Sequence, residues 1–509
     1  MLATIPSAVL FGVDGQPVDV EVHVGNGLPG FHLVGLPDTA VRESRDRVKA
    51  AMSTCGLDFP NRKITVNLAP SAVRKSGAGL DVAIAIGVLA AAGHVAGDAV
   101  AGLAFLGELG LDGSIRRVPG IVPLVGALSS AIVVVPRGCG REAALVAPGD
   151  VREVSTLLEL VAALRGDAEW PSPPAEPPPA EPTTEPTHRD LSEVRGQAVG
   201  RLALEVAAAG GHHLLLAGPP GAGKTLLASC LPGLLPELDR GDALVATRVH
   251  SAGGLPLPAG GLIRRPPFRS PHQSSSSVSL LGGGPALRPG EVSYAHAGVL
   301  FLDELGEFAV PMLDALRQPL EDGRIRIARA KAVVEYPARF LLVAAMNPCP
   351  CGRGGRPGTC TCSDRALLRY RRRLSGPLLD RIDLRVDVPR PDAAQLLAAA
   401  SGESSAVVAA RVAEARAMAA SRGVRCNAEL RAADLDVVAP LDASSARLFE
   451  DALHAGTLSA RGLHRCRRVA RTLADLRTGD GDAPVTEEDV CLALQLRAEP
   501  DLLAVGDAA

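Results

Sequence analysis

The chain has 509 residues, of which 47% are hydrophobic and 21% charged, and its formal net charge is −3. That length predicts roughly two to four domains at about 150 residues each, and the composition excludes a globally disordered chain. The small net charge excludes a uniformly basic nucleic-acid coat, although a local basic surface is compatible with it.

Location and redox state follow from two further features. No apolar run is long enough to cross a membrane, and the N-terminus lacks a basic region followed by an apolar core, so we expect a cytoplasmic protein without membrane contact. The ten cysteines are then not a disulfide framework. Six of them are scattered and are predicted to be small core residues: Cys55, Cys139, Cys230, Cys426, Cys466 and Cys491.

Residues 1–165 are predicted to form an α/β domain. Valines alternate with polar residues from Val18 to Val24, which is the period of a strand, and Asp14-Gly15 predicts a hairpin turn before it. A charged helix is predicted over Ala40–Met52 and an apolar helix over Leu80–Ala92. Two more strands are predicted at Lys63–Leu68 and Ala131–Pro136.

Residues 166–189 are predicted to form a linker. The stretch from Trp170 to Thr187 is rich in proline and glutamate. Such a composition neither buries a core nor holds a helix, so an extended, semi-rigid connection is expected. A ligand for a proline-recognition domain is the alternative.

Residues 190–389 carry the strongest motif, a phosphate loop between a strand at Leu214–Ala217 and a helix that continues through Leu226–Leu231. Backbone N–H groups of this loop surround a phosphate, the lysine reaches the β- and γ-phosphates, and the threonine ligates Mg²⁺. An ordinary Gly-Pro turn before a helix is the alternative. The predicted ATP-binding residues are Gly218, Pro219, Pro220, Gly221, Ala222, Gly223, Lys224 and Thr225.

Two later strands of the same domain end in polar residues. The apolar run Val299–Leu302 precedes Asp303, which is expected to hold the Mg²⁺ shell, and Glu304, which is expected to activate water. The run Phe340–Met346 precedes Asn347, an expected contact of the attacking water or the γ-phosphate. A turn asparagine before a proline is the alternative for Asn347.

Four cysteines with the pattern C-x-C-x₈-C-x-C follow directly. Four thiolates within fourteen residues can close a tetrahedral, structural Zn²⁺ site. Free thiols that oxidise readily and two reversible disulfides are the alternatives. The predicted ligands are Cys349, Cys351, Cys360 and Cys362.

Residues 390–509 are predicted to be mostly helical. Within Leu458–Leu476, apolar residues recur at helical spacing on one face, and Arg461, Arg465 and Arg468 fall on another. These arginines either contact a ligand or solvate the face of the helix.

With these motifs in order, nearly the whole chain resembles the YifB/ComM family, whose ATPase part is similar to magnesium chelatase. The resemblance is carried by the phosphate loop, Gly298–Glu304, Ser375–Asp383 and the segment Gly27–Ala51. It implies an α/β fold class: an AAA+ P-loop core at 190–389 with a helical lid at 390–509, preceded by a Lon-protease-like α/β domain.

The resemblance also implies roles for individual residues. Arg381 would be the arginine finger that reaches the γ-phosphate on a neighbouring subunit, which requires a homo-oligomeric ring, expected to be a hexamer. An internal ion pair between Arg381 and Asp383 is the alternative. Arg461 would be the sensor-2 residue and Asn347 sensor 1. In related ring motors a hairpin like residues 323–335 grips DNA, here through Arg329 and Lys331. A hairpin whose charged tip is simply solvated is the alternative.

The likeness of the N-terminal domain to Lon protease does not extend to catalysis. The position of the Lon serine corresponds to Gly77, and that of the Lon lysine to Val122. Ser76 and Lys75 are adjacent, and neighbours in a chain rarely form a dyad, so we expect a non-proteolytic assembly or partner module.

Together these predictions describe a ring-forming ATPase with ATP, Mg²⁺ and structural Zn²⁺ that moves on DNA without sequence specificity. Helicase or branch-migration activity in recombination or natural transformation is the expected use. The alternatives are a magnesium chelatase motor subunit and an ATP-gated assembly or chaperone adaptor.

Overall fold

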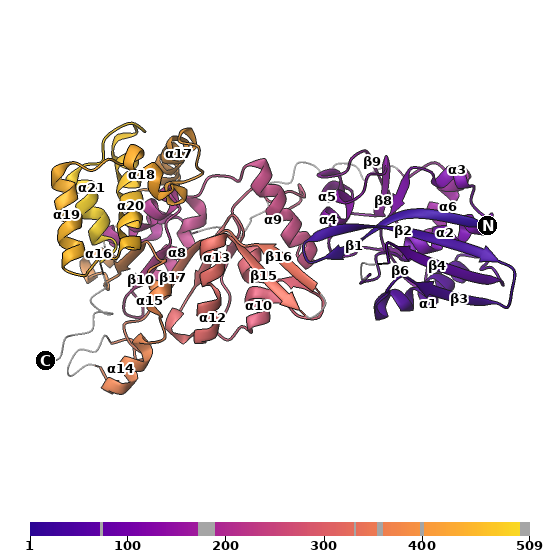
Figure 1. Cartoon of the computed structure of the whole chain (residues 1–509), viewed down its shortest axis with the longest axis horizontal. Coiled ribbons are helices and arrows are strands. Elements are labelled where there is room, and N and C mark those ends of the chain that lie inside the picture. Colours follow the sequence, from indigo (N-terminus) through magenta and orange to yellow (C-terminus); the bar gives the residue numbers. More distant parts are fainter. Residues whose placement is uncertain (72–74, 172–188, 330–331, 354–359, 398–401, 499–509) are drawn as a thin grey trace.

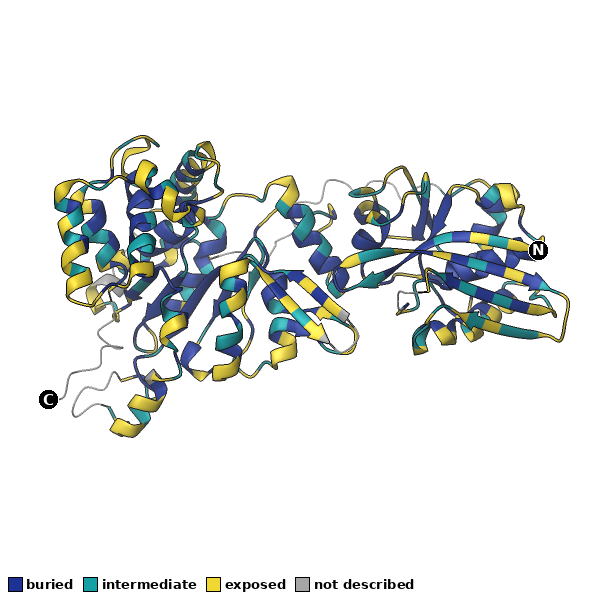
Figure 2. Ribbon diagram, viewed as in Figure 1, coloured by how far each residue is buried: buried dark blue, intermediate teal, exposed yellow. Residues whose placement is uncertain are grey.

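The computed structural model describes residues 1–71, 75–171, 189–329, 332–353, 360–397 and 402–498. Figure 1 shows an elongated molecule, with the N-terminal α/β domain at one end, the phosphate-loop domain in the middle and a helical domain at the other end. Each of the three regions has buried apolar residues of its own (Figure 2).

The N-terminal domain is built on a four-stranded sheet in the order β1-β2-β4-β3, with β3 parallel to β4 and the other pairs antiparallel. Every second residue of β2 is buried, from Val18 to Val24, as the alternation predicts. The turn before β2 lies at Gly12-Val13, because Phe11 already pairs with Asp14, so the predicted turn at Asp14-Gly15 is two residues too late. The strands are β1 (Leu2–Phe11), β2 (Asp14–Gly25), β3 (Gly30–Val34) and β4 (Lys63–Ala69).

Helices pack on this sheet and join it to a second, three-stranded parallel sheet in the order β5-β8-β9. All eleven residues of α2 (Asp81–Ala91) are buried, which explains its uniformly apolar sequence. The remaining elements are α1 (Thr39–Thr54), α3 (Gly97–Val100), β5 (Leu103–Phe105), β6 (Glu108–Leu109), β7 (Ile115–Arg116), α4 (Ile121–Gly126), β8 (Ile132–Pro136), α5 (Gly140–Ala144), β9 (Asp150–Val154) and α6 (Leu157–Arg165).

The middle domain has a five-stranded, fully parallel sheet in the order β11-β14-β17-β10-β18. Its three central strands are completely buried, as expected for a parallel sheet covered by helices on both faces. The strands are β10 (Leu214–Ala217), β11 (Phe268–Arg269), β14 (Val299–Leu302), β17 (Leu341–Met346) and β18 (Leu384–Asp387).

The helices and small hairpins around this sheet complete the domain. The predicted hairpin is present as β15 (Arg324–Arg329) and β16 (Ala332–Pro337), with Ile325 buried and Arg324 and Arg326 exposed on the opposite face. The others are α7 (Ala198–Gly210), α8 (Lys224–Cys230), α9 (Arg240–Gly253), α10 (Ser277–Leu281), β12 (Gly282–Gly283), β13 (Arg288–Pro289), α11 (Glu291–Tyr294), α12 (Val310–Ala315), α13 (Arg317–Asp322), α14 (Asp364–Arg371) and α15 (Gly376–Leu379), with 3₁₀ turns η1 (Leu191–Glu193), η2 (Leu231–Gly233) and η3 (Leu305–Glu307).

The C-terminal domain is helical, as predicted, and α20 is its centre. The apolar face of α20 packs into the core that the lid shares with the middle domain. The elements are α16 (Ala393–Leu397), α17 (Ser405–Ser421), η4 (Asn427–Glu429), α18 (Ala432–Val438), α19 (Ala443–His454), α20 (Ala460–Thr478) and α21 (Glu487–Gln495).

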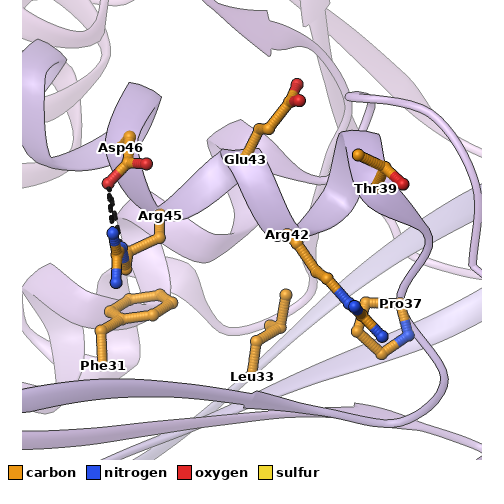
Figure 3. Close-up of a pocket in the computed structure, with 8 residues that line it drawn as sticks. All are labelled: Phe31, Leu33, Pro37, Thr39, Arg42, Glu43, Arg45 and Asp46. Carbon is orange, nitrogen blue, oxygen red and sulfur yellow. Dashed lines mark hydrogen bonds and ion pairs between the residues drawn. The ribbon is translucent and has the colours of Figure 1, made fainter.

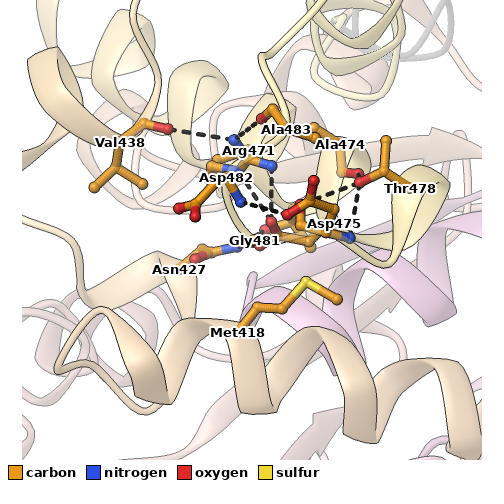
Figure 4. A network of polar contacts seen from close by, with 12 residues as sticks. Met418, Asn427, Val438, Arg471, Ala474, Asp475, Thr478, Gly481, Asp482 and Ala483 are labelled. Carbon is orange, nitrogen blue, oxygen red and sulfur yellow. Dashed lines mark hydrogen bonds and ion pairs between the residues drawn. The ribbon is translucent and has the colours of Figure 1, made fainter.

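A buried polar network ties these helices together around Asp475 of α20 (Figure 4). Arg471 donates from Nε to Asp475 Oδ1 at 3.0 Å, and Arg422 from the end of α17 donates to both carboxylate oxygens at 2.6 and 2.7 Å. Asn427 donates to Asp475 Oδ2 at 2.8 Å, and Arg471 also reaches the carbonyl of Ala483 at 2.5 Å. One buried carboxylate thus organises three separate segments of the lid.

The N-terminal domain docks on the middle domain through α9 and the β15–β16 hairpin. The backbone N–H of Gly120 donates to the carbonyl of Ser251 at 2.7 Å, and that of Val122 donates to Ser251 Oγ at 3.2 Å. Val13, in the β1–β2 turn, belongs to the same buried cluster as Val334 of the hairpin. The two domains therefore share apolar packing and hydrogen bonds to both the backbone and the side chain of Ser251.

Among the described helices, none combines the length and the apolarity that crossing a membrane requires.

Candidate functional site

The phosphate loop lies between β10 and α8, as its sequence predicts. Gly221 and Gly223 have φ of 76° and 93°, a left-handed conformation that favours glycine and lets successive N–H groups face one concave side. The N–H of Gly218 donates to the carbonyl of Met346 on the neighbouring strand at 3.1 Å, which fixes the start of the loop.

Lys224 lies inside this loop. Its side chain is 7% exposed, and Nζ donates to the carbonyls of Gly218 and Pro219 at 2.7 and 3.0 Å and to Asn347 Oδ1 at 3.1 Å. Burial lowers the pKa of Lys224, and the nearby carboxylates of Asp303 and Glu304 oppose that change. The ammonium group is therefore held where a bound phosphate would replace neutral carbonyl partners.

Thr225 and Asp303, next to the loop, are the candidate Mg²⁺ ligands. Thr225 Oγ1 donates to Asp303 Oδ2 at 2.8 Å, so a hydroxyl and a carboxylate already lie side by side. Oxygen ligands of these two kinds are those that Mg²⁺ takes in phosphate-loop proteins. Glu304 follows in a left-handed conformation, with φ of 53°, and its side chain is exposed at the same edge of the sheet.

The structure thus brings the predicted phosphate loop, Asp303, Glu304 and Asn347 to one place. They follow β10, β14 and β17, and parallel strands end at a common edge. In such an arrangement Glu304 can accept a proton from water while Asn347 holds that water or the terminal phosphate.

Arg381 lies at the opposite end of the strands, the amino end. Leu384, at the start of β18, pairs with Leu214, and the N–H of Asp383 donates to the carbonyl of His213, so this segment is level with the amino ends of the strands. Arg381 pairs with Glu321 at the end of α13 and donates to the carbonyl of Pro377 at 2.6 Å. It therefore does not reach the phosphate loop of its own chain.

The ion pair between Arg381 and Asp383 that the sequence left open is not formed. Asp383 instead accepts a hydrogen bond from Arg465 of α20 at 2.6 Å, and Arg465 also donates to the backbone carbonyl of Arg381 at 2.9 Å. Burial by itself raises the pKa of Asp383, but Arg465 and the adjacent histidines His212 and His213 hold it at about 2.

Arg461 lies at this same amino-end edge. It is exposed on the first turn of α20, whose capping residue Ser459 donates to Asp380 Oδ1 at 3.1 Å. Two further arginines of α20 are engaged inside the fold rather than exposed to solvent. Arg465 and Arg467 are ion-paired to Asp383 and Asp436, because the helix packs between two layers of the fold.

Several residues at the site were not found from the sequence. Glu321 has no motif position of its own, since only the fold brings the end of α13 beside Arg381. Arg390 donates from Nε and Nη2 to the carbonyl of Pro220 at 3.2 and 3.1 Å, and Gln197 donates to the carbonyl of Ala222 at 3.0 Å. Their proximity to the loop in space, rather than along the chain, identifies them.

The four clustered cysteines converge. Cys349 Sγ lies 3.4 Å from Cys351 Sγ and 3.8 Å from Cys360 Sγ, and the four sulfurs all lie within 4.8 Å of one another. A tetrahedral zinc ion with Zn–S bonds of about 2.3 Å needs sulfurs about 3.8 Å apart, so the donor set fits the metal. All ten cysteines lie in the described residues, and none of them forms a disulfide.

The side chains of both predicted DNA contacts lie outside the part of the chain that the structure describes. Lys331 lies outside the described residues. Arg329 ends strand β15, and only its backbone is described. On the described part of the hairpin, Arg326 is exposed and Arg324 pairs with Glu335 at 2.8 Å.

The structure places both positions that the resemblance assigns to the Lon catalytic pair. Gly77 has no side chain, and Val122 is buried where its backbone donates to Ser251 of the middle domain. Lys75 is fully buried, its pKa is lowered by burial, and its ammonium group contacts the carbonyl of Pro70.

A separate pocket of about 420 Å³ lies in the N-terminal domain between β3 and α1 (Figure 3). Phe31 and Leu33 line one side of it, and Arg42 and Glu43 line the other. This pocket is remote from the phosphate loop and contributes nothing to that site.

The fold and the site define the class of the protein, an AAA+ P-loop protein of the magnesium-chelatase type. Three family models agree with this class: "Magnesium chelatase, subunit ChlI" over residues 190–396, "Subunit ChlI of Mg-chelatase" over 20–138, and "Magnesium chelatase, subunit ChlI C-terminal" over 402–497.

Full-length relatives narrow this class to a family. The chain is 41% identical to the uncharacterized protein YifB of Escherichia coli over 511 residues, which cover 99% of this chain and 98% of YifB. It is 40% identical to the competence protein ComM of Haemophilus influenzae over 506 residues, again 99% and 98% of the two chains. The chain belongs to the YifB/ComM family.

A shorter match supports the fold of the N-terminal domain. The chain is 28% identical to Lon protease 2 of Bacillus subtilis over 153 residues, which cover 27% of this chain and 26% of that protein. The fold class predicted from the sequence, an AAA+ core with a helical lid behind a Lon-like domain, is thereby confirmed.

Proposed function

We propose that the protein is a ring-forming ATPase that uses ATP hydrolysis to move on DNA. The observation that carries this proposal is that the predicted ATP-site residues lie at opposite ends of the strands of one parallel sheet. Lys224, Asp303 and Glu304 lie at the carboxyl edge, whereas Arg381 lies at the amino edge. A cation at the amino edge can reach a phosphate only on another subunit, which favours a ring.

The chemistry follows from residues of this chain. The phosphate loop and Lys224 bind the β- and γ-phosphates, and Thr225 and Asp303 hold Mg²⁺, which neutralises the charge that develops on the phosphates. Glu304 accepts the proton of the attacking water, and Asn347 orients that water. Arg381 and Arg461 of the next subunit then complete the site from its open side.

Subunit mixing tests this division. Lys224→Ala and Arg381→Ala variants should each be inactive alone, because one lacks the phosphate ligand and the other lacks the finger. After random mixing, roughly one interface in four combines an intact loop with an intact finger, so ATPase activity should partly return. No recovery, in rings shown by mass to contain both variants, would contradict the shared site.

The DNA proposal is supported by the exposed basic hairpin and by the name of the competence protein ComM, a full-length relative. DNA should stimulate ATP hydrolysis, and an Arg329→Ala/Lys331→Ala variant should lose that stimulation while keeping the rate without DNA. Arg45→Ala, which removes an exposed arginine of the N-terminal domain, is the matched control. Because phosphate contacts displace counterions, the stimulation should fall steeply with salt. Branched-DNA unwinding by the wild type is the direct assay for helicase or branch-migration activity.

A second candidate is a magnesium chelatase motor subunit, which the names of the three family models favour. Such a subunit would need porphyrin-binding partners and would be indifferent to DNA. Chelatase activity with added partner subunits, together with an ATPase rate unchanged by DNA, would support this candidate over the first.

A further inference from the structure

The cysteine cluster lies directly against the ATP site. Cys349 comes two residues after Asn347, and Asn347 accepts a hydrogen bond from Lys224. Gly352, inside the cluster, has φ of 77°, and a Cβ atom there would come within 2.5 Å of Pro220 Cγ in the phosphate loop. The cluster thus contacts the phosphate loop through a backbone surface that only glycine leaves open.

The other end of the cluster is attached to the turn that carries Glu304. Helix α14 begins with the capping residue Ser363, immediately after the last cysteine. Tyr370 of that helix is buried against Gly306, and Arg373 donates to the carbonyl of Gly306 at 2.5 Å and to Glu307 at 3.1 Å. The segment from residue 347 to residue 373 therefore begins at one catalytic element and ends on another.

We propose that the four cysteines bind a divalent metal ion that prefers thiolate ligands, namely zinc. We further propose that this ion holds the elements of the ATP site in position. The bound metal joins Cys349 and Cys351, next to Asn347 and Pro220, to Cys360 and Cys362, next to α14. Since both legs of the segment contact the site, fixing them together fixes Asn347, the phosphate loop and the Glu304 turn relative to one another. The inference rests on the proposed ATP site.

Two variants distinguish the effect of losing the bound metal from the effect of disturbing the contact between Gly352 and Pro220. Cys360→Ser/Cys362→Ser removes two ligands, with Cys491→Ser on α21 as the matched control outside the cluster. Gly352→Ala keeps all four thiols but presses a methyl group on Pro220. Its matched control is Gly423→Ala, which has the same kind of backbone, with φ of 78°, and no atom within 4 Å of the added Cβ.

The measurements are metal content after purification under reducing conditions, and affinity for a fluorescent ATP analogue. We expect about one zinc per chain in the wild type and in all variants except the double cysteine variant. The double cysteine variant and Gly352→Ala should both bind the analogue at least tenfold more weakly than their controls. Hydrogen exchange should show lost protection in residues 218–225 and 303–307 but unchanged protection in the N-terminal domain.

The outcomes distinguish a failure of this inference alone from a failure of the proposed function. A wild type without thiolate-bound metal, or a zinc-free cysteine variant with unchanged affinity for the analogue, overturns the inference. If the cysteine variant does not fold, Gly352→Ala decides: full metal content with the affinity of Gly423→Ala contradicts the contact. A metal-loaded wild type that binds no nucleotide overturns the proposed ATPase together with the inference. Loss of DNA dependence alone affects only the proposed function.

Discussion

At the scale of single residues, the ATP site depends on side chains whose neighbours are already in place. Glu304 is the one acidic side chain of the site that is exposed and not bonded to Thr225, so it is the residue available to accept a proton from water. Asp303 by contrast is engaged with Thr225, and its expected role is to hold a metal.

Glu304→Gln therefore gives the first prediction. The variant should bind ATP with unchanged affinity, because the phosphate loop is intact, and should hydrolyse it at least about 100-fold more slowly, because general base catalysis is lost. Turnover by phosphate release and affinity by a fluorescent analogue measure the two effects. Glu450→Gln, an exposed change on α19, should leave both unchanged; a slow rate caused only by weak binding would contradict the role.

The sequence predicted which candidate site residues meet better than it predicted their partners. Asp303 and Asn347 directly follow strands of one parallel sheet, and Lys224 and Thr225 open the helix after the loop that follows a third strand, which are local properties of the chain. Glu321 lies sixty residues from Arg381 in sequence, so only the folded chain brings them together. Contacts of that kind have no signature in a single sequence.

At the scale of elements, one buried carboxylate that faces two arginines stabilises the packing of the lid helices. Asp475 is fully buried and faces two arginines, Arg422 and Arg471, so its removal would leave both guanidinium groups without a carboxylate partner. Breaking a buried ion pair from one side is costly because the remaining charge stays desolvated.

Asp475→Asn is thus expected to destabilise the protein by about 3–5 kcal/mol. Asp436→Asn is the control, since Asp436 is 75% exposed although it also pairs with an arginine of α20, and it should cost less than about 1 kcal/mol. Chemical denaturation of both variants measures the difference. Equal losses would show that the network around Asp475 is not the main support of the lid.

The elements themselves were largely predictable from periodicity. The valines of β2, the apolar helix α2 and the strands β10, β14 and β17 all match, because each buries a regular pattern. The turn before β2 was misplaced, since Asp14-Gly15 has turn-forming residues but Phe11 and Asp14 already pair in the sheet. For the arginines of α20 the sequence left ligand contact and solvation open, and it did not show that Arg465 and Arg468 bond to Asp383 and to the carbonyl of Leu430.

At the scale of the whole molecule, three histidines with a strongly lowered pKa make folding sensitive to acid. Burial lowers the pKa of His212, His213 and His296 to about 4, well below the ordinary value of 6.5. His213 and His296 also accept backbone hydrogen bonds through Nδ1, which only the unprotonated nitrogen can do. The folded chain therefore keeps them neutral while the unfolded chain takes up protons.

Stability should consequently fall as the pH drops from about 6.5 towards 4, because in that window the unfolded state binds more protons than the folded state. Each histidine contributes a loss of about 1.4 kcal/mol per pH unit at most. Denaturation at pH 7.5 and 5.5 measures the change. His296→Asn retains an acceptor but does not titrate, so it should show a smaller loss; an identical pH dependence would exclude His296 as a source.

The docking of the two α/β domains was not predictable, since neither Val13 nor Ser251 belongs to a motif. A consequence of this docking is that a small movement at the contact would be amplified along the N-terminal domain. The β1–β2 turn rests against the β15–β16 hairpin, and β2 runs for twelve residues, or roughly 40 Å, from that contact to its far end. A rotation of the hairpin that the N-terminal domain follows as a rigid body would move the far tip of the sheet many times further than the contact itself. A small rotation of the hairpin would thereby become a large sweep at the N-terminal end of the molecule.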